Sequence, residues 1–196
     1  MIVLERNELM STRKWGSEEA LATMAIEKIS NAKQPSLLIG GYGMGFTLRA
    51  ALKALPADAH VTVVELMPEI IEWARGPMAE LTAGCLDDPR VTLVQSGVAP
   101  FIEGALADYD AILLDVDNGP DGLVREDNNI LYSKTGLRTA KRALTADGVL
   151  AIWSAAADPV FTRRLEQCDF VVKEVKVAAR SNGKGSKHVI WFATKR

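Results

Sequence analysis

Short apolar runs alternate along most of the chain with segments in which apolar residues recur at helical spacing. The runs are rich in β-branched and aliphatic residues and predict buried strands at 36–39, 61–64, 91–94, 111–114 and 149–153. The segments between them predict helices over about 17–30, up to Pro56, from Pro68, over 98–107 and over about 136–144. Strands that are apolar throughout and alternate with helices are typical of a parallel sheet covered on both faces.

Polar residues mark the beginnings of two of these helices. Ser17 is placed to cap the first helix, and Glu18 and Glu19 lie in its first turn, where the positive end of the helix dipole favours carboxylates. Asp158 is placed to cap a later helix, which Pro159 opens.

The end of the chain follows a different pattern. Strands are predicted at 170–177 and 188–193, and only the loop RSNGKGSK separates them, so they form an antiparallel hairpin at the edge of the sheet. We therefore predict a doubly wound, Rossmann-like α/β fold with a mostly parallel seven-stranded sheet and a terminal antiparallel hairpin. Residues 1–16 fit this pattern least and are predicted to be a short N-terminal extension with the pattern of a hairpin.

Composition narrows the class of protein. The chain has 196 residues, of which 48% are hydrophobic and 24% charged, and this is typical of one globular domain. The net charge of −2 argues against a nucleic-acid-binding surface, and no apolar run of 18 residues is present that could span a membrane.

The cysteines and histidines show no pattern of a metal site. Cys85 and Cys168 lie far apart in the sequence, and His60 and His188 have no partners at the spacing of metal ligands. We therefore expect reduced thiols, a cytoplasmic protein and no metal.

A glycine-rich loop, GGYGMG, lies between the strand at 36–39 and the helix that follows it. Gly41, Gly43 and Gly45 permit a tight turn and a close approach of backbone amides to a ligand. Glu65 ends the next strand, where a carboxylate can accept hydrogen bonds from both hydroxyls of a ribose. These features predict a site for an adenosine-like nucleoside. The GxGxG spacing and the reversed terminal hairpin favour S-adenosylmethionine over a dinucleotide.

An acidic segment follows the strand at 111–114. Residues 115–127 carry a net charge of −4, so the rest of the chain carries +2. Because the segment starts at the carboxyl end of a parallel strand, where ligands bind in open α/β sheets, it is expected to attract a cation such as an amine. Asp115 is the candidate proton acceptor, and Asp117 and Asp121 are candidate anchors for the far ammonium of a diamine. Tyr132 is a further candidate for contact with the substrate.

Five segments stand in a characteristic order: SLLIGGYGMGFTLRAAL, VTVVELMPEII, DPRVTLV, YDAILLDVDNGP and GVLAIWS. In order and spacing they resemble the spermidine synthase (aminopropyltransferase) family, with its class I S-adenosylmethionine-dependent methyltransferase fold, over roughly residues 11–155. The resemblance implies that the three loop glycines line the nucleoside, that Glu65 holds the ribose and that Asp115 is the catalytic aspartate. Within QSGV, Ser96 or Gly97 stands at the position of the family's adenine-side acid, and Ser96 is the candidate contact. The resemblance also implies polyamine biosynthesis and a homodimer.

Three functions remain open. The first is transfer of an aminopropyl group from decarboxylated S-adenosylmethionine to an amine, with 5′-methylthioadenosine as the leaving group, and the acidic segment favours it. The second is methyl transfer from intact S-adenosylmethionine. Spermidine synthases typically carry an aspartate in the glycine loop, whereas Met44 and apolar neighbours stand there in this chain. The third is a nucleoside-binding module without turnover. In each case residues 17–196 are predicted to form one nucleoside-binding domain, catalytic in the first two.

Overall fold

The computed structural model describes residues 2–4, 7–10, 15–116, 129–183 and 185–195. The strands are β1 (Ile2–Leu4), β2 (Asn7–Met10), β3 (Ser36–Gly40), β4 (His60–Glu65), β5 (Val91–Gln95), β6 (Tyr109–Leu114), β7 (Leu144–Ser154), β8 (Phe170–Ala178) and β9 (Lys187–Lys195). The helices are α1 (Gly16–Lys28), α2 (Phe46–Ala54), α3 (Pro68–Arg75), α4 (Ala79–Thr82), the 3₁₀ helix η1 (Cys85–Asp87), α5 (Val98–Glu103), α6 (Asn129–Tyr132), α7 (Lys134–Ala143) and α8 (Pro159–Glu166).

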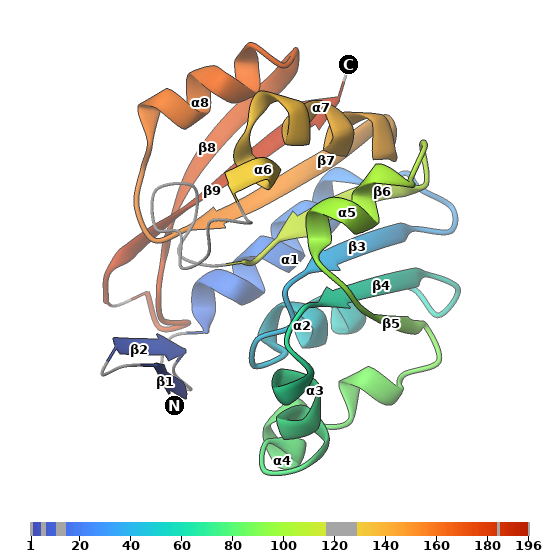
Figure 1. Ribbon diagram of the computed structural model, residues 1–196, viewed down its shortest axis with the longest axis vertical. Helices are drawn as coiled ribbons and strands as arrows, with labels where there is room; N and C mark the ends of the chain where they lie inside the picture. Colours follow the sequence, from blue (N-terminus) through green and yellow to red (C-terminus); the bar gives the residue numbers. More distant parts are fainter. Residues whose placement is uncertain (1, 5–6, 11–14, 117–128, 184, 196) are drawn as a thin grey trace.

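Seven strands form the central sheet in the order β5-β4-β3-β6-β7-β9-β8 (Figure 1). The strands from β5 to β7 pair in parallel. Strand β9 runs antiparallel to both of its neighbours, β7 and β8. The predicted seven-stranded, mostly parallel sheet with a terminal hairpin is therefore confirmed. Strands β1 and β2 pair with each other as a separate antiparallel sheet.

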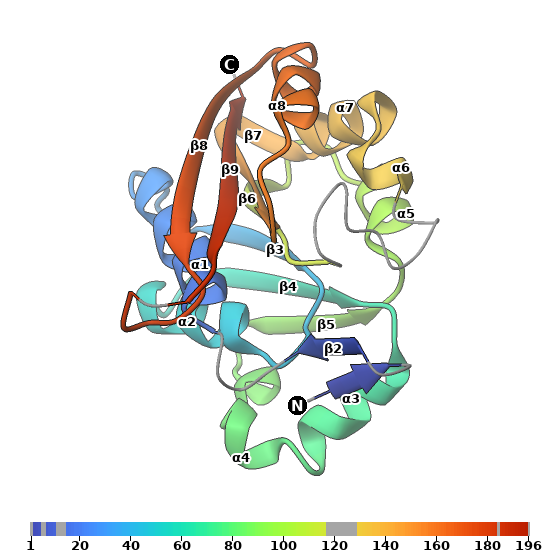
Figure 2. The same cartoon turned by 90° about the vertical axis from the view of Figure 1, so that its left-hand side faces the viewer.

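Helices cover both faces of the sheet, as Figure 2 shows with α1 and α2 on one side and α5, α6 and α7 on the other. Successive side chains of β3 alternate between the two layers. Leu37 and Ile39 belong to the core beneath α1, α2 and α3. Leu38 belongs to the core beneath α5, α7 and α8. Because each central strand is buried on both faces, its sequence is apolar throughout instead of alternating.

Several helix boundaries differ from the prediction. Helix α1 begins one residue earlier, with Trp15 at its N-cap, so the prediction that Ser17 caps it is wrong. Helix α5 ends at Glu103, short of residue 107. The prediction for α8 is confirmed, because Asp158 Oδ1 accepts hydrogen bonds from the backbone N–H groups of Val160 at 2.8 Å and Phe161 at 3.0 Å. The sequence pattern missed α4, η1 and α6, which are each too short to show a periodicity.

In the part of the chain that the structure describes, no helix is both long enough and apolar enough to cross a membrane.

Candidate active site

The carboxyl ends of β3 and β6 lie side by side in the middle of the sheet. From β3 the chain winds outward through β4 to β5, whereas β6 and β7 extend the sheet in the other direction. In open α/β sheets, ligands bind at such a change of winding direction. The backbone N–H of Gly41 donates to the Val64 carbonyl at 2.9 Å, and that of Asp115 donates to the Gly40 carbonyl at 2.9 Å. The residues after β3 and β6, and the last residues of β4, therefore meet at one place.

The glycine loop follows β3, and its conformation requires glycine. Gly41, Gly43 and Gly45 have φ angles of 88°, 55° and 75°, in the left-handed region that side chains disfavour. A Cβ atom on Gly41 would overlap the backbone carbonyl oxygen of Asp115. Gly41 thus allows the backbone after β3 to lie directly against the backbone after β6.

The Glu65 carboxylate connects the glycine loop to the turn after β4. It is buried, and its Oε2 accepts a hydrogen bond from the backbone N–H of Tyr42 at 2.9 Å. Its Oε1 accepts another from the backbone N–H of Met67 at 2.8 Å. A carboxylate has about four lone-pair sites, so two remain for the hydroxyls of a ribose. Glu65 therefore has both a structural role and the capacity to bind a ligand.

Ser96 lies beside Glu65 at the carboxyl end of β5. Its backbone N–H donates to the Glu65 carbonyl at 3.1 Å, and its hydroxyl donates to the Gly97 carbonyl at 3.2 Å. The two residues predicted to hold the nucleoside are thus neighbours, and contact of Ser96 with a ligand stays a prediction.

Asp115 follows the last residue of β6, and the hydroxyl of Thr47 donates to its Oδ2 at 2.6 Å. Thr47 is the second residue of α2, directly after the glycine loop. Burial raises the pKa of Asp115 to about 6, although the hydrogen bond from Thr47 acts in the opposite direction. A carboxylate whose pKa lies near neutrality is well matched to accepting a proton at that pH.

A second carboxyl group belongs to the same site. Burial, and then repulsion from Asp115, raises the pKa of Glu18 to about 7. From the sequence, Glu18 is expected only to lie in the first turn of a helix, and Thr47 is not among the candidate residues. The sequence gives no signal for either residue, because their relation to Asp115 depends on how α1 packs against α2 and β6.

The remaining candidates have different outcomes. Tyr132 is buried, and its hydroxyl donates to the Val116 carbonyl at 3.2 Å, while its ring meets that of Phe161 edge to face. Tyr132 therefore supports the backbone next to Asp115 from within the core, and its contact with the substrate stays a prediction. Asp117 and Asp121 lie outside the described residues.

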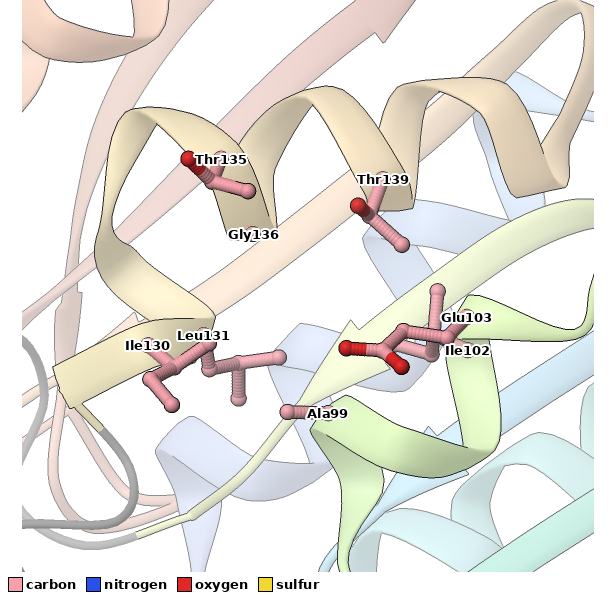
Figure 3. A pocket seen from close by; sticks show the side chains of 8 residues that line it. All are labelled: Ala99, Ile102, Glu103, Ile130, Leu131, Thr135, Gly136 and Thr139. Atoms are coloured by element: carbon pink, nitrogen blue, oxygen red, sulfur yellow. The ribbon is translucent and has the colours of Figure 1, made fainter.

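A pocket lies elsewhere, between α5 and the pair α6 and α7 (Figure 3). Its lining is mainly apolar with three polar side chains and comprises Ala99, Ile102, Glu103, Ile130, Leu131, Thr135, Gly136 and Thr139. None of the candidate site residues lines it. Among the described residues, no three His, Cys, Asp or Glu side chains lie close enough together to hold a metal ion.

The sheet order, the terminal reversed strand and the site at the change of winding direction define a protein with a class I methyltransferase-type fold. The family model of the spermine/spermidine synthase domain matches residues 15–184, and the chain belongs to this family.

Individual relatives agree with this assignment. The chain is 33% identical over 127 residues to a polyamine aminopropyltransferase of Mycobacterium tuberculosis (strain CDC 1551 / Oshkosh), a match that covers 63% of this chain and 23% of that protein. It is 29% identical over 174 residues to putrescine N-methyltransferase 2 of Nicotiana attenuata, covering 88% of this chain and 42% of that one. The chain thus spans less than half the length of these two relatives.

Solved structures share the fold. The crystal structure of spermidine synthase from Thermotoga maritima superposes with a TM-score of 0.73 at 22% identity, covering 94% of this chain and 61% of that one. A spermidine synthase in complex with the transition state analogue AdoDATO gives a TM-score of 0.72 at 22% identity, covering 94% and 60%.

Proposed function

We propose that the chain is a spermidine-synthase-like transferase that moves an aminopropyl group from decarboxylated S-adenosylmethionine to an amine. The observation that carries this proposal is the position of Asp115. It lies against the glycine loop and accepts a short hydrogen bond from Thr47, at the same end of the sheet as the buried Glu65 carboxylate. Membership of the spermine/spermidine synthase family supports the same reaction.

In this proposal the nucleoside and the amine occupy opposite sides of the glycine loop. Glu65 accepts hydrogen bonds from the ribose, and the loop glycines let the backbone approach the nucleoside. The amine enters from the side of Asp115, and the acidic segment 115–127 attracts its positive charge. Asp117 and Asp121 are proposed to anchor the far ammonium, and Tyr132, whose hydroxyl supports Val116, is proposed as a further contact with the substrate.

The reaction needs a base because amines are mostly protonated at neutral pH. Asp115 takes a proton from the attacking ammonium, and the freed lone pair forms the new C–N bond. The C–S bond of the sulfonium breaks with its electron pair going to sulfur, which releases 5′-methylthioadenosine. A spermidine synthase of the same fold is known in complex with the transition state analogue AdoDATO, which supports a donor related to S-adenosylmethionine.

Product analysis tests the proposal directly. The purified chain is incubated with putrescine and decarboxylated S-adenosylmethionine, and the products are identified by mass spectrometry. Formation of 5′-methylthioadenosine and an aminopropylated amine in equal amounts is expected. If neither product forms with any diamine tried while the nucleoside still binds, the proposal of aminopropyl transfer is wrong, and methyl transfer and a nucleoside-binding module remain as the alternatives.

Methyl transfer is the second candidate, and Met44 favours it. Met44 is buried in the glycine loop, so the loop offers the donor an apolar side chain in place of the aspartate that spermidine synthases typically carry. An apolar loop does not repel the carboxylate of intact S-adenosylmethionine. The similarity to a putrescine N-methyltransferase supports this alternative. Incubation with intact S-adenosylmethionine distinguishes the two, because methyl transfer yields S-adenosylhomocysteine and an N-methylated amine.

The cellular setting is also part of the proposal. Cys85 and Cys168 are both free and buried, which supports the expectation of a reducing compartment, the cytoplasm. A homodimer is expected from the family resemblance, and sedimentation equilibrium would test it.

A further inference from the structure

A line of hydrogen bonds leads from Glu18 to the protein surface. The Ser17 hydroxyl donates to Glu18 Oε2 at 2.8 Å and lies 2.9 Å from Nδ1 of His188. On the other side of the imidazole, Nε2 lies 3.2 Å from the hydroxyl of Ser186. Ser17 is fully buried, His188 is half-buried and Ser186 is exposed, so the line passes from the interior to solvent.

The packing of α1 against the β8–β9 hairpin holds this line in place. The backbone N–H of Gly16 donates to the Ala179 carbonyl at 3.0 Å, which fixes the first turn of α1 at the end of β8. The ring of Trp153 meets the His188 imidazole edge to face, with centroids 4.8 Å apart. Both ring nitrogens of His188 are therefore held toward hydroxyl groups.

Glu18 lies next to the candidate base, because the Thr47 hydroxyl that contacts Asp115 Oδ2 at 2.6 Å also lies 3.4 Å from the backbone carbonyl oxygen of Glu18. Helix α1 contacts α2, β6, β7, β8 and β9. The charged groups that act on Glu18 are Asp115 at the end of β6 and Glu19 in α1 itself. His188 of β9 lies on the other side of the Ser17 hydroxyl, which contacts both Glu18 and Nδ1 of His188. Both the Glu18 carboxyl and the Asp115 carboxyl have a raised pKa because of burial, so near neutral pH the pair tends to retain a proton.

Transfer to an amine releases a proton in the site, and this proton needs a path to solvent. An ammonium and a sulfonium react to give one substituted ammonium and a neutral thioether, so charge balance releases one proton in each turnover. That proton first reaches the carboxyl pair and must leave before the next ammonium can be deprotonated.

The Ser17 hydroxyl can carry the proton by reversing its hydrogen bonds. When Glu18 is ionised, Ser17 donates to it and accepts from Nδ1 of His188. When Glu18 is protonated, its O–H donates to Ser17, which then donates to Nδ1 while Nε2 releases a proton toward Ser186. One such transfer delivers one proton from Glu18 to solvent and leaves the proton of His188 on Nδ1, so the imidazole must exchange with solvent back to its Nε2–H form before the next turnover.

We propose that Glu18 is a second proton acceptor of this site and that Ser17 and His188 connect it to solvent at the β8–β9 loop. This inference rests on the proposed transfer to an amine, and it assigns Ser17 and His188 as positioning residues.

Turnover with putrescine, by whichever donor the wild type uses, gives the first test. Ser17→Ala and His188→Gln should lower kcat about tenfold or more, leave nucleoside affinity unchanged and flatten the rise of kcat with pH. Added imidazole buffer should restore part of the kcat of His188→Gln. The matched control is His60→Gln, because His60 is the chain's other histidine and is exposed at the start of β4. If Ser17→Ala and His188→Gln both keep the wild-type kcat and the wild-type pH profile, the proposal is wrong.

Imidazole NMR of the ligand-free protein tests the connection without turnover, so it stays decisive even if no transfer product is found. The chain has two histidines, and His60 serves as the internal reference. In Glu18→Gln, an isosteric change, the His188 signals should titrate at lower pH by about half a unit or more, while those of His60 stay unchanged. If His188 titrates identically in Glu18→Gln and wild type, Glu18 and His188 are not connected and the proposal is wrong.

Discussion

Gly41 and Asp115 touch through their backbones, although they follow different strands. Gly41 adopts a φ of 88°, and its missing side chain leaves the space that the Asp115 carbonyl oxygen occupies. The glycine loop therefore does more than approach a ligand. It sets the position of the residue assigned as the proton acceptor.

Replacing Gly41 should affect both stability and turnover. Gly41→Ala places a Cβ against the Asp115 backbone and in an unfavourable φ, so we expect the melting temperature to fall by roughly 5–10 °C. Asp115 must shift to make room, and kcat should fall about tenfold or more, since small displacements in a site are costly. Thermal melts and product assays on one sample measure both effects.

Gly84 is the matched control for this experiment. It also has a positive φ, of 67°, but nothing lies within 4 Å of a Cβ placed on it. Gly84→Ala should therefore show only the backbone cost, about 2–4 °C, with unchanged kcat. Equal losses in the two variants would mean that the contact with Asp115 has no consequence.

Glu65→Gln should weaken nucleoside binding about tenfold or more, because hydrogen bonds to a charged carboxylate are worth about 1.5–3 kcal/mol. The amide that replaces one oxygen also turns a donor toward the backbone N–H of Tyr42 or Met67. Calorimetry with S-adenosylmethionine and 5′-methylthioadenosine measures the change. Glu69→Gln removes the same charge from an exposed position in α3 and should bind normally. Full affinity in Glu65→Gln would show that the ribose is held elsewhere.

The sheet and its helices could be predicted because each depends on one continuous stretch of chain. Leu37, Leu38 and Ile39 are apolar in succession, as burial on both faces requires. Contacts between distant stretches left no such pattern. Ser17 and His188 are separated by 171 residues, and Ser17 had a sufficient local interpretation as a helix cap. Glu18 likewise suited the helix dipole, so nothing in its neighbourhood pointed to Asp115.

Asp115→Asn should lower turnover by about 10²–10⁴-fold, as expected for loss of a general base. Nucleoside affinity should change little, because Glu65 and the glycine loop do not depend on that charge. Steady-state kinetics and calorimetry on the same preparation separate the two effects.

Asp110 offers a control at the opposite end of the same strand. Its carboxylate accepts hydrogen bonds from the backbone N–H of Ser36 and the hydroxyl of Thr145, both at 2.9 Å. Asp110→Asn should lower the melting temperature but preserve turnover per folded molecule. A destabilised but fully active Asp115→Asn would give Asp115 the same structural role and remove it from the mechanism.

The two carboxyl groups with raised pKa values should make folding stability decrease as pH rises. The pKa of Glu18 rises from 4.5 to about 7 on folding, and that of Asp115 from 3.8 to about 6. Between the unfolded and the folded pKa of each group, the native state binds more protons than the unfolded state. The free energy of unfolding therefore falls with increasing pH over this range. Above about pH 7 both groups are ionised and the full cost of burying them is present. Well below pH 3.8 both are neutral in either state.

Glu18→Gln should therefore be more stable than the wild type at pH 8 and equal to it at pH 4, by urea midpoints at both pH values. Asp88 provides a comparison of opposite sign, because hydrogen bonds from Arg90 lower its pKa to about 2. The contribution of Asp88 is present above its ordinary pKa and is lost as pH falls toward 2, so Asp88→Asn should not stabilise the protein at pH 8. If Glu18→Gln is equally stable or less stable than the wild type at pH 8, the Glu18 carboxylate has an additional partner that offsets its burial.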